Sequence, residues 1–75
     1  MPTYHYAASN SYGTRFTYDS DGWMVHAFRD RKSRDAFVKE DSAHRETVDA
    51  KTAYKIAPDL RNEYPQNAHR VVVMD

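Results

Sequence analysis

The sequence predicts one small α+β domain over residues 1–75, in which a small antiparallel sheet carries two short helices packed on one face. A chain of 75 residues has room for only one hydrophobic core. Seven of the ten aromatic side chains fall within residues 1–28, which suits strands, whereas residues 29–63 hold most of the charged residues, which suits short amphipathic helices. A valine-rich stretch near the C-terminus adds a last strand. The predicted order is therefore strand, strand, strand, helix, helix, strand.

Alternating and turn-forming residues define the N-terminal part of the predicted sheet. Residues 3–7, TYHYA, alternate as a strand does, and the turn-forming residues 8–13 predict a loop. Two further strands are predicted over 14–18, TRFTY, and 23–28, WMVHAF. The DSDG between them is rich in residues that accept turn conformations, so we expect these two strands to form a β-hairpin.

Capping residues and apolar spacing place the two helices. Ser33 suits the N-cap of a helix over 33–41. Asp49 suits the N-cap of a second helix over 49–57, where alanines recur at helical spacing. Pro58 then ends this helix because proline supplies no amide hydrogen. The connector between the helices, SAHRETV, is expected to be extended near its end.

The predicted core combines apolar side chains from all of these elements. The three consecutive valines within 70–74 predict a strand that is buried on both faces and therefore central in the sheet. In the predicted hairpin, the face that carries Phe16 and Val25 turns towards the core. The residues expected to be mostly buried are Phe16, Val25, Phe28, Phe37, Tyr54, Ile56, Val71 and Val73.

Composition excludes several classes of protein. The sequence has no cysteine, which excludes disulfides and thiolate zinc sites. Eleven basic and eleven acidic residues cancel, which weakens a simple nucleic-acid-binding role. No apolar run approaches the roughly 18 residues of a membrane span, and the N-terminus lacks the pattern of a signal peptide. We therefore expect a complete cytoplasmic protein, monomeric or homodimeric, with no membrane partner.

The sequence contains no motif that names a reaction. His5, His26, His44 and His69 have no partner at the spacing of metal ligands, so we expect no metal site. The serines lie in turns and near helix starts, and two glycines are too few for a phosphate-binding loop. We therefore expect a protein that is not an enzyme and needs no cofactor.

Acidic and aromatic residues suggest a surface for a protein partner. The tip of the predicted hairpin joins acidic residues to large aromatic side chains, which often anchor interfaces. Further carboxylates follow along the first helix, where they could meet a basic groove. The expected partner-binding residues are Tyr18, Asp19, Asp21, Trp23, Asp30, Asp35, Glu40 and Asp41.

The alternative is a small nucleic-acid-binding accessory or regulatory protein. The only basic cluster, RDRKSR, could meet phosphates at the start of the first helix, and aromatic side chains on strands can stack on bases. The residues of this alternative site are Arg29, Arg31, Lys32 and Arg34.

WMVHAFRDRKSRDAFVKED, followed by DAKTAYKI, resembles small proteins encoded by phages and mobile elements, over roughly residues 22 to 57. In size, absence of cysteine and α+β composition, the chain is similar to anti-CRISPR proteins. This resemblance implies a stoichiometric inhibitor that binds a host CRISPR-Cas effector complex and blocks nucleic-acid binding or activation. It carries over no functional residue, because anti-CRISPR proteins share no sequence signature.

Overall fold

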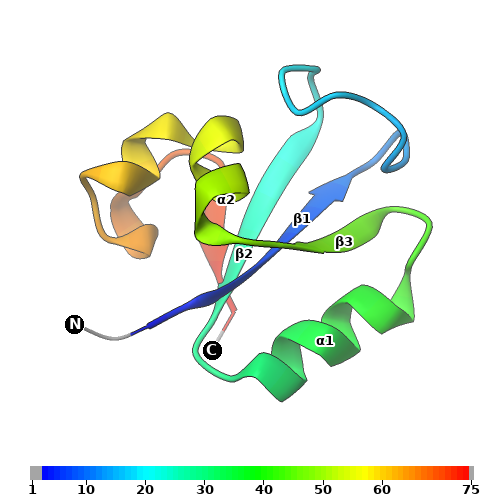
Figure 1. Ribbon diagram of the computed structural model, residues 1–75, viewed down its shortest axis with the longest axis horizontal. Coiled ribbons are helices and arrows are strands. Elements are labelled where there is room, and N and C mark those ends of the chain that lie inside the picture. Colours follow the sequence, from blue (N-terminus) through cyan, green and yellow to red (C-terminus); the bar gives the residue numbers. More distant parts are fainter. Residues whose placement is uncertain (1–2, 75) are drawn as a thin grey trace.

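The computed structural model describes residues 3–74 as a four-stranded sheet with two α-helices (Figure 1). The elements in chain order are β1 (His5–Asn10), β2 (Trp23–Phe28), α1 (Arg31–Glu40), β3 (Arg45–Val48), α2 (Ala50–Ile56), the 3-10 helices η1 (Pro58–Arg61) and η2 (Pro65–Asn67), and β4 (Val71–Val73). The strand order across the sheet is β3-β1-β2-β4. The α+β class is confirmed. The sheet is mixed, because β1 pairs antiparallel with β2 and β3 whereas β4 lies parallel to β2.

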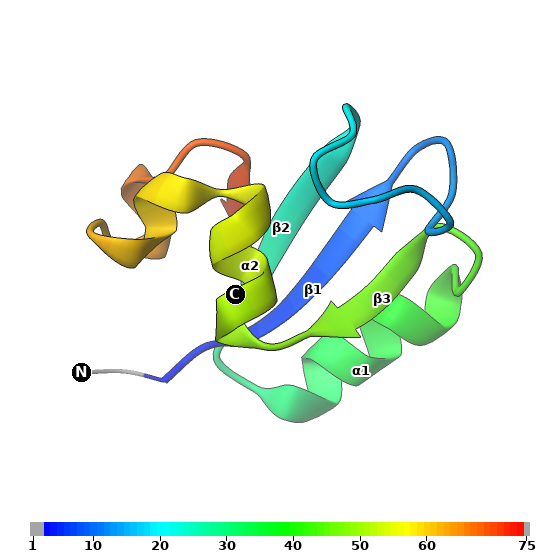
Figure 2. The same ribbon diagram turned by 45° about the horizontal axis from the view of Figure 1, so that its top comes forward.

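The two helices cover opposite faces of the sheet, which differs from the expected packing on one face. Ala53 and Ile56 of α2 belong to the main core, together with Val25 of β2. The Phe37 ring of α1 instead lies 4.5 Å from the ring of His26, which alternates with Val25 along β2 and so points to the other face. Figure 2 shows α2 in front of the strands and α1 behind β3.

The predicted strand over 14–18 is wrong, because residues 11–22 form a loop of turns that connects β1 to β2. β1 continues to Asn10, which pairs with Trp23 in the register of the sheet. Asn10 is buried, and its side-chain carbonyl accepts a hydrogen bond from the Tyr12 amide at 2.8 Å. Pairing between β1 and β2 leaves no partner for residues 14–18. The third strand is β3, which lies between the two helices in sequence.

Each α-helix begins directly after the aspartate that caps it. The Asp30 carboxylate accepts a hydrogen bond from the Ser33 amide, so α1 begins at Arg31 and the predicted N-cap at Ser33 is wrong. Asp49 caps α2 as predicted, since its carboxylate accepts from the Thr52 amide at 2.8 Å. The helix then ends at Ile56, before a proline.

The core differs in membership from the predicted one and centres on β1, β2 and α2. Phe16 is 49% exposed, so its predicted burial is wrong. β4 is an edge strand whose Val72 is exposed, so the predicted central strand that is buried on both faces is also wrong. Trp23, at 1% exposure, is the largest fully buried side chain. Of the other expected core residues, Val25, Phe28 and Ile56 are buried, whereas Phe37, Tyr54, Val71 and Val73 are half-buried.

Candidate functional site: a cleft lined by tyrosines

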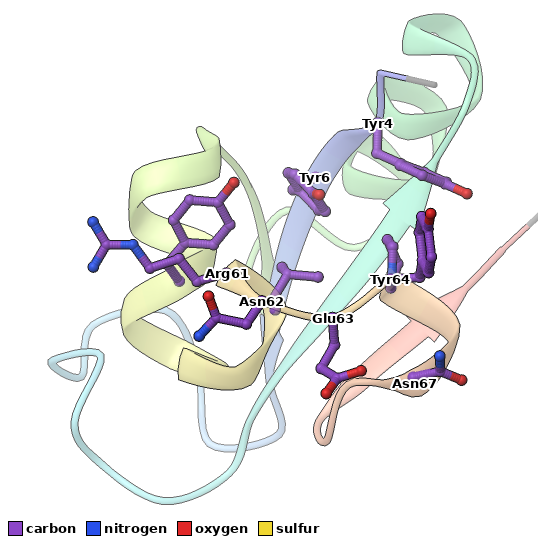
Figure 3. A pocket seen from close by; sticks show the side chains of 10 residues that line it. Tyr4, Tyr6, Arg61, Asn62, Glu63, Tyr64 and Asn67 are labelled. Atoms are coloured by element: carbon purple, nitrogen blue, oxygen red, sulfur yellow. The ribbon is translucent and has the colours of Figure 1, made fainter. Parts of the chain in front are cut away.

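A cleft of about 570 Å³ opens beside the start of β1, next to α2 and the segment that follows it (Figure 3). Four of the six tyrosines line it, which no other part of the described chain matches. In Figure 3, Arg61 and Asn62 lie at one end, Tyr4 and Tyr64 at the other, and Tyr6 between them. The lining residues are Tyr4, Tyr6, Tyr54, Leu60, Arg61, Asn62, Glu63, Tyr64, Pro65 and Asn67.

Two buried residues hold the wall of the cleft against the core. Leu60 in η1 and Pro65 at the start of η2 are buried, whereas the four residues between them, 61–64, are exposed. Prolines begin both 3-10 helices, since their fixed φ suits a first helical position. The Asp59 carboxylate also accepts a hydrogen bond from the His69 amide at 2.7 Å, which ties the two ends of the segment together. Both ends of the wall are thus anchored to the rest of the fold.

Tyr6 forms the base of the cleft. Its ring is in the core, and the Tyr4 ring is inclined to it by 29° with centroids 6.5 Å apart. Because the two residues are two positions apart, they project to the same side of the chain as it enters β1. Burial raises the pKa of Tyr6, and the nearby hydroxyls of Tyr54 and Tyr4 add to the effect. The Tyr6 hydroxyl therefore stays protonated at neutral pH.

The polar groups of the cleft are left unpaired by the fold. Among residues 3–74, no hydrogen bond uses the hydroxyl of any of the four lining tyrosines or the side-chain amides of Asn62 and Asn67. The only buried side-chain polar atom without a partner in this part of the chain is elsewhere, on His26, so the cleft groups are open to water. They are available to a ligand.

The charges around the cleft nearly balance. Glu63 and Arg61 are the two charged residues of the lining. The Arg29 guanidinium lies 5.8 Å from the centroid of the Tyr4 ring, close enough for a cation–π interaction. The site therefore has no excess of negative charge.

The structure brings the Tyr18 and Trp23 rings of the predicted hairpin tip together, with ring centroids 5.0 Å apart, but it buries the indole. Trp23 is buried, and its indole N–H donates to the Thr17 carbonyl at 2.8 Å, so this side chain cannot anchor a partner as predicted. The Tyr18 hydroxyl donates to Glu46 at 2.8 Å. Burial first, then this hydrogen bond, raises the pKa of Tyr18 to about 12. Asp19 and Asp21 are exposed, and Asp19 accepts from the Thr17 hydroxyl.

The other expected acidic residues have partners within the protein. Asp30 caps α1, and its hydrogen bonds with the Ser33 side chain and amide lower the pKa of Asp30. Asp35 pairs with Arg34 at 2.7 Å. The hydrogen bond to His44 lowers the pKa of Asp41.

Glu40, the last of the acidic set, lies 3.6 Å from Arg45. These carboxylates thus pair with groups on and around α1. None of them lines the cleft.

The residues of the basic cluster, which form the alternative site, have different surroundings in the structure. Arg34 is half-buried, and it donates to the Tyr6 carbonyl at 3.2 Å as well as to Asp35. Arg29 lies over Tyr4. Arg31 and Lys32 are exposed on the first turn of α1. Only part of the cluster therefore faces water.

Ser9 and His26 form a close pair. The Ser9 hydroxyl lies 2.8 Å from His26 Nε2, as in a nucleophile and its base. His26 Nδ1, however, is buried without a partner among residues 3–74. Within the described residues, the pair therefore lacks the third group that orients the base of a catalytic triad.

Within residues 3–74, no three histidine or acidic side chains converge as metal ligands would. None of the helices in this range has both the length and the apolar character needed to cross a bilayer.

Comparisons of the chain with models of protein families, with curated proteins and with solved structures found no match. The site therefore has to be interpreted from its own geometry.

Sequence reasoning missed the cleft because its residues are far apart in the chain. Tyr4 and Tyr6 precede Tyr54 by about two thirds of the sequence, and only the fold brings them together. The signal that could have revealed it was the EYP tripeptide at residues 63–65. A tyrosine between a charged residue and a proline, in a loop, is typical of an exposed aromatic side chain.

Proposed function

We propose that the protein is a non-enzymatic binding protein that recognises another protein through its tyrosine cleft. The observation that carries this proposal is the group of four tyrosines with unpaired hydroxyls around one cleft. Tyrosine offers a large, rigid contact surface and a polar group at its tip, which is why it is common in protein interfaces.

Preorganisation of the cleft supports the same proposal. Leu60 and Pro65 hold the wall, so a ligand does not have to order it on binding. Tyr64, at 56% exposure, presents most of its ring to water in the free protein. A large apolar side chain in this position is stabilised when a partner covers it.

The resemblance to small phage-encoded proteins leads us to a particular form of this function. We propose an inhibitor of the anti-CRISPR type, which acts in the cytoplasm of a host cell. It binds a CRISPR-Cas effector complex stoichiometrically and blocks nucleic-acid binding or activation. Such an inhibitor needs no reaction chemistry, which agrees with a serine–histidine pair whose histidine has no third group on Nδ1 among residues 3–74.

Phage plaquing on CRISPR-bearing hosts tests this function. The chain is expressed in a panel of hosts, each carrying a different type of CRISPR-Cas system that targets the phage. We expect the parent protein to restore plaquing in at least one host and Tyr64→Ala to abolish this effect. Tyr12→Ala is the matched control, because Tyr12 is 71% exposed and lies outside the cleft. If the parent protein restores plaquing in none of the hosts, the anti-CRISPR form of the proposal is overturned. If Tyr64→Ala restores plaquing as fully as the parent, the cleft is not the binding site.

A further inference from the structure

The hydrogen-bonding groups of the cleft can serve a ligand that brings acceptors. Tyrosine hydroxyls, asparagine amides and the Arg61 guanidinium supply many N–H and O–H groups. Glu63 is the one lining residue whose side chain is purely an acceptor. A ligand with many carbonyl oxygens can therefore accept hydrogen bonds from several of these side chains.

We propose that the cleft binds a proline-rich segment in the polyproline II conformation, an inference that rests on the proposed protein-binding function and names its ligand. Proline has no N–H, and a polyproline II chain has no internal hydrogen bonds, so its carbonyls are all available as acceptors. The tyrosine hydroxyls and asparagine amides of the cleft supply the matching donors. Proline rings pack against aromatic side chains, as they do in other aromatic-lined grooves that take such segments.

The cleft suits this ligand better than an extended peptide that joins a sheet. Addition of a strand needs the free edge of an existing strand. The wall of this cleft is made by η1, η2 and the residues between them, which offer side chains rather than a strand edge. Polyproline II binding needs no such edge.

Two other ligand classes fit the charges less well. A methylated lysine needs an aromatic cage without competing cations, yet Arg61 lines this cleft and Arg29 already lies over the Tyr4 ring. A single-stranded nucleic acid needs stacking platforms and a basic groove. Here the Tyr6 ring is in the core, Glu63 would face phosphates, and the net charge of the chain is zero.

Binding of a fluorescein-labelled decaproline peptide, followed by fluorescence anisotropy, tests the proposal. The control peptide is a ten-residue glycine–serine sequence with the same label. We expect decaproline to bind at least about tenfold more tightly than the control peptide. A trimethyllysine peptide and an oligothymidine are titrated in parallel, and equal or tighter binding of either one overturns the assignment to proline. So does equal binding of the two ten-residue peptides.

Variants of the protein test whether binding occurs in the cleft. Tyr64→Ala should weaken decaproline binding by about tenfold or more through loss of a ring contact. Tyr54→Phe keeps the ring, which packs against the core, and removes only the hydroxyl, so a smaller loss is expected. Tyr12→Ala should leave binding unchanged. Melting temperatures of all three confirm folding, and unchanged affinity in a folded Tyr64→Ala overturns the site.

The decaproline-binding test and the plaquing test can fail independently of each other. If Tyr64→Ala abolishes inhibition in the host but decaproline does not bind, the proposed function stands and the proline-rich ligand is wrong. If decaproline binds in the cleft but plaquing is never restored, the ligand class stands and the inhibitor function is wrong.

Discussion

Replacing Trp23 by phenylalanine should destabilise the protein strongly. The indole ring is 1% exposed, and its N–H donates to the Thr17 carbonyl at 2.8 Å. Loss of this hydrogen bond costs about 1 kcal/mol. The smaller ring leaves a cavity among the β2 and α2 side chains, which costs about another 1–2 kcal/mol. The sum of about 2–3 kcal/mol is a large share of the roughly 3–5 kcal/mol that one small core supplies.

Urea and thermal denaturation, followed by far-ultraviolet circular dichroism, measure this loss. For a chain of this length each 1 kcal/mol lowers Tm by about 4–8 °C, so Trp23→Phe should melt roughly 10–20 °C lower. Phe16→Ala is the matched control, since this aromatic side chain belongs to the preceding loop and is 49% exposed. Its cost should stay below about 1 kcal/mol. If Phe16→Ala melts lower than Trp23→Phe, the assignment of the loop and core is wrong.

Four further predictions concern stability. Burial first, then the charge of Arg45, lowers the pKa of His26, so on acidification the unfolded chain binds a proton before the folded protein does. The free energy of unfolding should therefore keep its full value above about pH 6.5 and fall from pH 6.5 towards 5. This fall should be smaller in His26→Gln. Asn10→Ala should cost about 1–3 kcal/mol in a urea titration by freeing the loop, and a change below about 0.5 kcal/mol would contradict its role as the loop anchor. Phe37→Ala, at a half-buried site on a helix with no buried residue, should cost about 1–3 kcal/mol, and a melt identical to the parent would show that α1 does not dock through this ring. Charge reversal of both Asp19 and Asp21 to lysine should leave Tm nearly unchanged, because both side chains are exposed, and a large drop would reveal a structural role.

The helices were predictable because their signals are local. Asp49 followed by alanines at helical spacing, and Pro58 beyond them, define α2 within a single short stretch. The first helix was placed correctly to within two residues at its start, because both Asp30 and Ser33 can cap a helix and only tertiary structure decides between them. Val25 was identified as core from strand alternation alone.

The arrangement of the strands was not predictable because it depends on pairing between distant segments. Residues 8–10, Ala-Ser-Asn, have the composition of a turn, yet they form the second half of a central strand. Ala8 is fully buried in the main core, on the side of the sheet that α2 covers. A small side chain suits that place, because the indole of Trp23 fills the same layer. Residues 14–18 have a composition that favours strands. They have no strand to pair with, because β1 already pairs with β3 on one side and with β2 on the other.

The candidate site was predicted least well, for the same reason. Asp19 and Asp21 are exposed, as a binding tip requires, but Trp23 belongs to the core. The cleft joins Tyr6 to Tyr54 and Tyr64, and no local pattern relates these three positions. Their role as a binding surface follows only from the fold.

Nuclear magnetic resonance of the tyrosine rings tests the central claim, that the cleft binds a proline-rich segment, most directly. With ¹³C-labelled tyrosine the six ring signals report on the cleft and on two positions outside it at once. On titration with decaproline, the account predicts that the signals of Tyr4, Tyr54 and Tyr64 shift progressively while those of Tyr12 and Tyr18 stay in place. Shifts at Tyr12 or Tyr18 with none at Tyr64, or no shift of any ring up to saturating peptide, would contradict it.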